Sequence, residues 1–416
     1  MNKKLFTLIS LVLVASFALA ACGTAATPTE APAAPVEPAA TEAPAATEVP
    51  APVGPTGEVT LWNAYQTGST EESTLTELVA NAQAAYPDLK INVLQIPFSE
   101  IFNKYQQEVA AGGGPDMFVA PNDDLGNWVR GAFVADITDK LAGKLDPVAE
   151  SGVAGMQVDG KLYGVPESAK AVALYYNKSL VPNPPKTTDE LLQMVKDGTP
   201  MTFFIGAYHM FGWPAAFGGK LLDENGKCVA DQGGWTEAYQ FLVDLKAAGA
   251  LMESDYGKAE TPFRQGETAM FVNGPWAYGD YKKDLGDNLG VVVMPAGPGG
   301  LAGPLNGIDG FYINPNSQNQ DAAIELALFL TNQASSQTYT DKAGHIAIRN
   351  DVTSSDPNLN AFAEASSSGF PRPQTVEFAN YWTPFGDALT KAIEGALTPE
   401  QAVTEACAAM NAANGK

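Results

Sequence analysis

The chain has 416 residues, with 47 acidic side chains against 24 basic ones and a formal net charge of −23 at pH 7. This acidic balance argues against a nucleic-acid partner, because binding phosphate requires clustered lysine and arginine, and against docking of the folded part onto anionic lipid. Only 17% of the residues are charged, while glycine (40) and proline (30) are frequent, as is typical of a secreted, loop-rich globular protein.

The N-terminus indicates export. Two lysines precede an apolar run from Leu5 to Leu19, which is too short to span a bilayer comfortably and is typical of a signal peptide. The run ends in LAACG (19–23), which resembles a bacterial lipobox and implies cleavage before Cys22 and lipidation of its thiol. A signal peptide without lipidation is the alternative. We expect residues 1–21 to be removed, leaving a cell-surface or periplasmic protein tethered to the membrane through Cys22 alone.

A linker is predicted between this cysteine and the folded part. Beyond the cysteine, residues 22–57 contain only Pro, Ala, Thr, Val, Glu and Gly, without an aromatic or basic side chain. Such a segment cannot bury enough apolar surface to offset the entropy lost on ordering, so we expect it to be disordered. The remainder of the chain is long enough for two lobes of ordinary domain size.

Strand and helix patterns alternate from residue 57 onward. The sequence predicts strands over 57–65, 89–97 and 116–121, with helices over 73–88 and from Phe98 to the glycines at 112–114. This alternation favours a parallel, doubly wound sheet.

The same patterns return in the second part of the chain. Thr187 and Glu190 form a capping box that opens a helix ending near Gly198. No fixed-period repeat is present, which argues against a solenoid. The other predicted elements are two strands with a polar break over 162–178, strands over 201–207, 269–272, 290–297 and 308–315, and helices over 236–249, 321–333 and 382–410.

Several segments between residues 58 and 416 carry specific motifs, among them GGGPDMFVAP, GKLYGVP, LYYNKSLVPNPPKTTDEL, FGWPAAFGG and DYGKAETPFRQGETAMFVNGPWAYG. Together they resemble the extracellular solute-binding proteins of ABC sugar importers, closest to maltose and maltodextrin binders. The resemblance implies a two-lobed periplasmic-binding-protein fold of the α/β class, each lobe a sheet flanked by helices, with several hinge crossings and the sugar bound between the lobes. It further implies an N-lobe of residues 58–168 plus 311–346 and a C-lobe of residues 174–305 plus 351–416.

A sugar binder needs flat aromatic rings for the apolar faces of the sugar and polar groups for its hydroxyl edges. Trp276 and Tyr278 follow directly after a predicted buried strand, at the carboxyl end where ligands bind in doubly wound sheets. The resemblance implies further ligand-binding residues: a stacking ring at Trp382, a sugar-contacting loop with Tyr208, Met210 and Phe211, and hydroxyl partners at Tyr256 and Asp123.

The chain also departs from the maltodextrin-binding pattern. Lys170 replaces a hinge-side carboxylate, Asp124 stands where relatives have an arginine, and Ala120 where they tend to have a tryptophan. Gln66 and Thr67 replace an acidic–basic pair. The specificity is therefore left open, with an α-glucan oligosaccharide as the first candidate. For each aromatic residue, the alternative role is core packing. Asp123 could instead cap a helix or be a solvated acid. Lys170 and Asp124 could each instead form an ion pair across the lobes.

The remaining candidates for chemistry are few. Cys228 and Cys407 could form a disulfide or remain two buried thiols. The two histidines, His209 and His345, are too few for a metal cluster or a histidine-based catalytic set, so no metal or cofactor is expected, and His345 is predicted to be structural.

The predicted function is that of a monomeric, non-enzymatic receptor that delivers a carbohydrate to the membrane permease of an ABC importer. The same role with another cargo, such as a different oligosaccharide or a polyol phosphate, is one alternative. An exported glycoside hydrolase is the other, but hydrolysis needs two acids facing one bond, and no acid here lies in a hydrolase-like motif.

Overall fold

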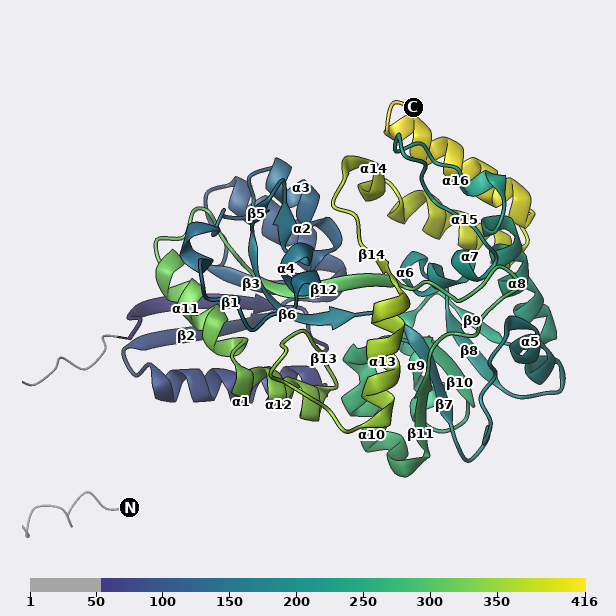
Figure 1. The fold of residues 1–416 in the computed structure, drawn as a ribbon, viewed down its shortest axis with the longest axis horizontal. Helices are drawn as coiled ribbons and strands as arrows, with labels where there is room; N and C mark the ends of the chain where they lie inside the picture. Colours follow the sequence, from purple (N-terminus) through teal and green to yellow (C-terminus); the bar gives the residue numbers. More distant parts are fainter. Residues whose placement is uncertain (1–53) are drawn as a thin grey trace, which may run out of the picture. The chain divides into compact units, whose positions relative to one another are not determined.

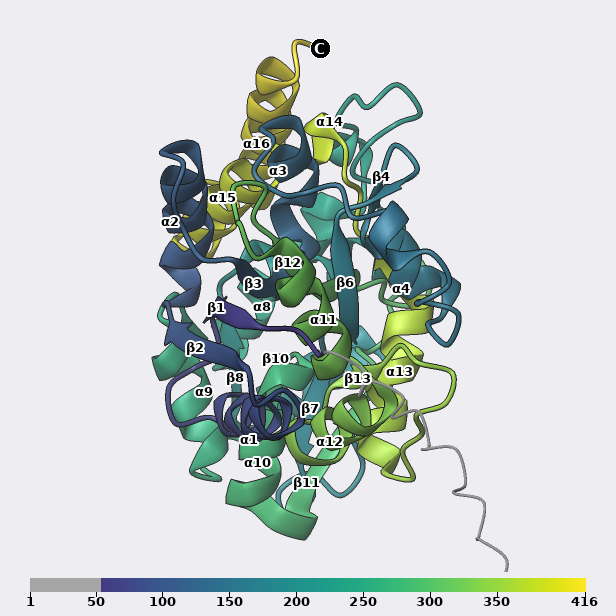
Figure 2. The same cartoon turned by 90° about the vertical axis from the view of Figure 1, so that its left-hand side faces the viewer.

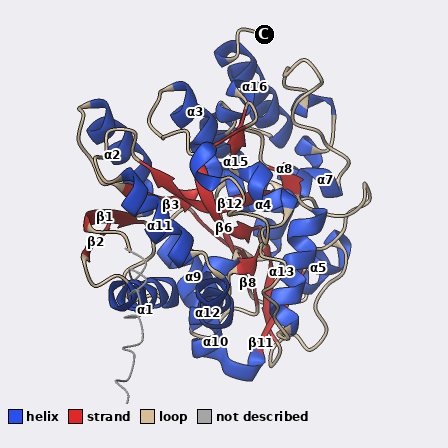
Figure 3. Ribbon diagram, turned by 60° about the vertical axis from the view of Figure 1, so that its left-hand side comes forward, coloured by secondary structure: helices blue, strands red, loops and turns tan. Residues whose placement is uncertain are grey.

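The structure, a computed structural model, describes residues 54–416 (Figure 1). The predicted signal peptide, Cys22 and most of the linker lie outside this range. The described part contains two mixed sheets flanked by helices (Figure 3). None of its helices combines the length and the apolar character that crossing a bilayer requires.

The first sheet has the strand order β13-β6-β12-β3-β1-β2, and β14 pairs with β12. β1 (Gly57–Asn63) pairs in parallel with β2 (Leu89–Gln95) and with β3 (Met117–Pro121), as predicted. The connecting helices are α1 (Thr70–Ala85) and α2 (Phe98–Ala110). α1 begins earlier than predicted because the side chain of Ser69 accepts a hydrogen bond from the backbone N–H of Glu72 and caps it.

Two long strands complete this sheet in the opposite sense. β6 (Gly164–Lys170) and β12 (Leu305–Ile313) pair antiparallel with each other, and β12 is also antiparallel to β3. β13 (Ile346–Ala347) pairs antiparallel with β6. The predicted parallel pairing therefore holds for β1, β2 and β3, but β6, β12 and β13 make the sheet mixed. β6 carries the chain away from the first sheet and β12 brings it back, so the two must run in opposite directions (Figure 2).

The second sheet has the order β11-β7-β10-β8-β9. β8 (Met201–Phe204) is parallel to its neighbours β9 (Leu251–Glu253) and β10 (Met270–Asn273). β7 (Ala173–Asn177) is antiparallel to both β10 and β11 (Leu289–Val292), so this sheet is mixed as well.

Helices cover the second sheet and build its core. α5 (Thr188–Lys196) begins where predicted, because the side chain of Thr187 accepts from the backbone N–H of Glu190. α8 (Trp235–Ala248) packs against α5, α15 (Trp382–Glu394) and α16 (Pro399–Ala413). The other elements are α3 (Leu125–Arg130), α4 (Glu150–Gly155), α6 (Ala207–Met210), α7 (Gly212–Ala216), α9 (Tyr256–Arg264), α10 (Tyr278–Leu285), α11 (Gln320–Leu330), α12 (Gln333–Ala343), α13 (Pro357–Ser368), α14 (Val376–Ala379), β4 (Gln157–Val158), β5 (Lys161–Leu162), β14 (Phe370–Pro371) and the short 3-10 helices η1 (Asn122–Asp124), η2 (Asp139–Leu141), η3 (Ala230–Gln232), η4 (Pro275–Ala277) and η5 (Gly286–Asn288).

We call the first sheet with α1–α4 and α11 the N-lobe, and the second sheet with α5–α9, α15 and α16 the C-lobe. Cys228 and Cys407, whose state the sequence left open, form a disulfide within the C-lobe that joins positions 179 residues apart. β6 and β12 lie side by side within the first sheet, and the chain passes to and from the second sheet at their ends (Figure 1).

Candidate functional site

Trp276 lies in η4, directly after the fully buried strand β10. Its ring folds back over Gly274, where a Cβ atom would lie only 1.9 Å from the indole, so glycine is required there. The indole Nε1 donates to the hydroxyl of Tyr256 at 2.8 Å, and Asn273 donates to the same hydroxyl at 2.8 Å. The ring is thus held in one orientation while remaining partly exposed.

Tyr208, on α6, continues the arrangement toward the end of β6. Its ring centroid lies 5.9 Å from that of Trp276, with 46° between the planes. Its hydroxyl donates to the backbone carbonyl of Lys170 at 3.2 Å. The ammonium of Lys170 lies 5.7 Å from the Trp276 ring centroid, within the range of a cation–π contact.

Trp382, at the start of α15, joins the same arrangement through Arg372. The guanidinium carbon of Arg372 lies 5.2 Å from the Tyr208 ring and 5.7 Å from the Trp382 ring. Trp276, Tyr208 and Trp382, which we call the aromatic row, come from three separate segments and are all partly buried. Ring–ring and cation–ring contacts connect them without a break.

Asp123 approaches the aromatic row from the N-lobe. It lies in η1 and forms an ion pair with the Nη1 atom of Arg372, which also donates to the side chain of Asn122 at 3.3 Å. Burial lowers the pKa of Arg372 to about 9, so the guanidinium remains charged at neutral pH. Aromatic faces, a cation and a carboxylate therefore lie next to one another.

Three other predicted ligand residues lie in packed interiors. Tyr278 is 1% exposed and its hydroxyl donates to Asp356. The Met210 sulfur accepts from Tyr381 at 3.5 Å, and Phe211 packs edge-on against the same tyrosine with ring centroids 5.4 Å apart. For Tyr278 and Phe211, this is the core-packing role that the sequence left open as the alternative to ligand binding.

The remaining predicted residues lie in the N-lobe. Asp124 accepts from Gln106 at 3.0 Å and from Asn127 at 2.5 Å, and its burial raises its pKa. Gln66 is exposed in the loop between β1 and α1, and Ala120 is buried within β3.

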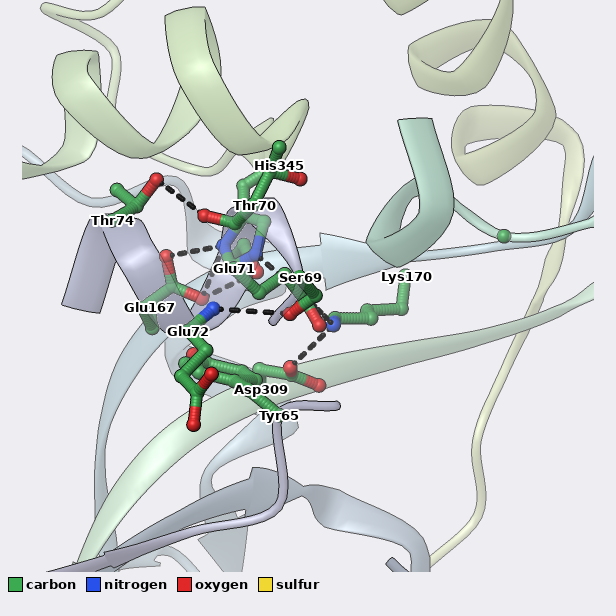
Figure 4. Close-up of polar contacts among 12 residues, drawn as sticks. Tyr65, Ser69, Thr70, Glu71, Glu72, Thr74, Glu167, Lys170, Asp309 and His345 are labelled. Atoms are coloured by element: carbon green, nitrogen blue, oxygen red, sulfur yellow. Dashed lines mark hydrogen bonds and ion pairs between the residues drawn. The ribbon is translucent and has the colours of Figure 1, made fainter. Parts of the chain in front are cut away.

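A buried network of charges adjoins Lys170 (Figure 4). The Lys170 ammonium lies 3.0 Å from Glu71 and 2.9 Å from Asp309. The two ring nitrogens of His345 lie 2.8 Å from Glu71 and 2.8 Å from Glu167. We call these five residues the hinge network, because they come from α1, β6, β12 and the residue before β13. Glu167 and Lys170 lie inside β6, where they are buried among these partners.

Burial and the mutual attraction of these charges shift the pKa values of the network residues in opposite directions. Burial disfavours the charged form of Lys170, but Asp309 and Glu71 outweigh it and raise the pKa of Lys170 above its usual value. Burial also opposes protonation of His345, yet Glu167 and Glu71 raise its pKa to about 9. Burial raises the pKa of Asp309 to about 6, against the attraction of Lys170. The network holds two cations among three carboxyl groups at neutral pH.

Arg372, Asn122, Asn273, Glu71 and Asp309 were not identified from the sequence. Arg372 did carry a signal, since it is a lone cation between Pro371 and Pro373 shortly before a predicted stacking tryptophan. Asp309 carried a similar one, as an acid inside the apolar strand IDGFYI.

A metal-binding site separate from the aromatic row is not found among the described residues. Among residues 54–416, no three or more His, Cys, Asp or Glu side chains are placed to hold a metal ion. A hollow of about 680 Å³ is lined by Tyr278, Lys282 and Asp356 among others, and by none of the aromatic row.

Residues 77–364 match the family described as bacterial extracellular solute-binding protein. The chain belongs to this family. This solute-binding protein is therefore a transport receptor, which confirms the prediction that it is not an enzyme.

Named relatives and a solved structure support the same assignment. The maltotriose-binding protein of Pyrococcus abyssi is 26% identical over 349 residues, covering 79% of this chain and 75% of the relative. The galactooligosaccharide-binding protein of Bacillus subtilis is 26% identical over 358 residues, covering 79% and 84%. The structure of the Thermus thermophilus maltotriose binding protein bound with maltotriose has 27% identity and a TM-score of 0.77, covering 86% of this solute-binding protein and 100% of that chain. The predicted fold class is confirmed.

Proposed function

We propose that this solute-binding protein captures an oligosaccharide between its N-lobe and C-lobe and delivers it to the membrane permease of an ABC importer. The aromatic row carries the proposal. Three flat rings from separate segments lie in one series, with Asp123, Arg372 and Lys170 beside them. Apolar ring faces with charged hydrogen-bonding groups at their edges suit the faces and the hydroxyls of a sugar.

The relatives narrow the cargo class. Two of the proteins described above are named for maltotriose and one for galactooligosaccharides, so a short oligosaccharide is the common feature. A maltodextrin-like α-glucan is our first candidate. In this proposal Trp276, Tyr208 and Trp382 contact sugar faces, and Asp123 and Tyr256 bind hydroxyls.

Binding and lobe closure are coupled in this proposal. A ligand that contacts both lobes favours the closed state by its difference in affinity for the closed and open states, and the permease recognises the closed state. Micromolar affinity corresponds to about −8 kcal/mol. We further propose that the receptor acts as a monomer, exported and tethered through Cys22.

An anionic cargo such as a polyol phosphate is the second candidate, because Lys170 and Arg372 both lie beside the aromatic row. Each cation is already neutralised within the chain, Lys170 by Glu71 and Asp309 and Arg372 by Asp123. A phosphate would have to compete with these carboxylates, so a neutral sugar is favoured.

The test is calorimetric titration of the purified chain with maltotriose, maltotetraose, a galactooligosaccharide and glycerol 3-phosphate. We expect a sugar to bind and Trp276→Ala to weaken it at least tenfold. Trp213→Phe is the matched control, because Trp213 is fully buried in the C-lobe core. Absence of sugar binding by the parent, or equal affinity of the Trp276 variant, would defeat the proposal.

A further inference from the structure

The segment from Phe370 to Thr375, which we call the strap, connects the two lobes. The backbone N–H of Arg372 donates to the carbonyl of Asn306 on β12 at 3.0 Å. Gln374 then bonds the N-lobe twice: it donates to the carbonyl of Asn122 at 3.0 Å and accepts from the N–H of Gly126 at 3.0 Å. After the short helix α14, the chain enters α15, which packs in the C-lobe core. The strap therefore holds Arg372 at the junction of the lobes.

The guanidinium of Arg372 occupies a closely fitted position. A Cβ atom on Gly307 of β12 would lie 2.7 Å from its Nη1, so this backbone must lack a side chain for the guanidinium to lie there. The ring centroids of Tyr208 and Trp382 lie 5.2 and 5.7 Å from its central carbon. The arginine is only 7% exposed, and Asp123 and Asn122 engage its Nη1.

One donor of this buried group is left over. The Nε atom of Arg372 is buried and has no hydrogen-bond partner among residues 54–416. Leaving a buried charged donor unsatisfied costs free energy, which a bound water or a ligand oxygen can recover by accepting from it. The leftover donor belongs to the same side chain that contacts two members of the aromatic row.

Resting on the proposed function, we propose that Arg372 is a specificity-determining residue of the sugar site. Its guanidinium donates to hydroxyls of the sugar unit that contacts Tyr208 and Trp382, while Asp123 accepts from a neighbouring hydroxyl. A donor and an acceptor held side by side match a vicinal diol, in which each hydroxyl can both donate and accept. The residue that follows Asp123 is Asp124, which is not a cation. The positive charge beside the Asp123 carboxylate therefore comes from Arg372 in the strap.

The test uses the full chain, the sugar that the parent binds best in the calorimetric panel, and its single-deoxy analogues. In the parent, removing one particular hydroxyl should weaken binding about tenfold or more. In Arg372→Gln the parent sugar should bind at least tenfold more weakly, and the penalty for that deoxy position should disappear. Arg372→Lys should not restore the parent pattern, because an ammonium lacks the planar fork of donors.

Arg130→Gln is the matched control. Arg130 donates to the carbonyl of Gln374 in the strap at 3.1 Å but is an exposed residue and is not among the contacts of the aromatic row, so its removal should leave both affinity and deoxy penalties unchanged. Circular dichroism melting shows whether each variant folds. If Arg372→Gln does not fold, the affinity and the deoxy penalties are measured on Arg372→Lys instead.

Two results would overturn the inference. One is unchanged affinity of the Arg372 variants. The other is a uniform loss for the parent sugar and all deoxy analogues, which would indicate a purely structural role. A parent that binds no sugar would instead remove the proposed function itself.

Discussion

The ammonium of Lys170 lies 2.9 Å from the carboxylate of Asp309 and thereby ties together β6 and β12, two long neighbouring strands of the first sheet. The same ammonium lies over the ring of Trp276. A single buried side chain thus connects the hinge network to the aromatic row. A movement of one lobe relative to the other about β6 and β12 would therefore act on the contact between the Lys170 ammonium and the Trp276 ring.

Replacing Lys170 by methionine should destabilise the chain strongly. The change leaves Asp309 buried without its cation and Glu71 with His345 as its only cationic partner, and breaking a buried pair in this way costs about 3–5 kcal/mol. Denaturant unfolding followed by circular dichroism measures the loss. Lys140→Met is the control, because its pair with Asp321 is exposed and should contribute little. Equal shifts in the two variants would contradict a stabilising role for the hinge network.

The stability of the chain should fall as the pH rises from about 6.5 to 9. His345 has a pKa of about 9 in the native state against about 6.5 when unfolded, so the native state retains a proton that the unfolded state releases. The contribution of the His345 proton to the free energy of unfolding is therefore fully present below pH 6.5. It is lost as the pH rises through 9, which lowers the free energy of unfolding by up to about 3 kcal/mol. Asp309, with a pKa of about 6, titrates below this window.

His345→Gln should remove this slope from a series of unfolding curves between pH 6.5 and 9. His209→Gln should keep it, because burial lowers the pKa of His209 to about 4 and it is neutral throughout the window. A slope that persists in the His345 variant would assign the pH dependence to other groups.

Reduction of the disulfide should destabilise the C-lobe. Cys228 and Cys407 are 179 residues apart, and closing a loop of that length is worth about 5 kcal/mol in the chain-entropy description, although native bonds usually deliver about 2–5 kcal/mol. Dithiothreitol should therefore lower the melting temperature of the parent. It should leave a Cys228→Ala/Cys407→Ala double variant unchanged, and an effect of equal size there would argue against the bond.

The ring of Tyr208 should matter more for sugar binding than its hydroxyl. Tyr208→Ala removes a member of the aromatic row and should weaken the affinity at least tenfold, about 1.4 kcal/mol or more. Tyr208→Phe keeps the ring and loses only the bond to the Lys170 carbonyl, so its affinity should stay within about threefold, well below the 1.4 kcal/mol that a tenfold change represents. Calorimetry with the parent's sugar measures both, and similar losses would assign the effect to the hydroxyl.

Local features of the chain were predictable because their causes are local. The start of α5 follows from the Thr187 cap, and the end of β10 follows from the glycine and proline that come after Asn273. Trp276 could be singled out for the same reason, as a large ring placed directly after a buried strand. The motifs along the chain were also sufficient to indicate its family.

Tertiary structure alone decided how distant residues meet. Asn122 and Arg372 are 250 positions apart, and their contact depends on the strap crossing to the N-lobe, which no local pattern specifies. The same holds for Cys228 with Cys407, for the antiparallel course of β6 and β12, and for the burial of Tyr278. Propensity, capping and turn chemistry act over a few residues, so the sequence by itself determined many of the helices and strands and the kind of receptor. The pairing of charges and rings depends on where the folded backbone brings their segments, and only the assembled lobes determine that.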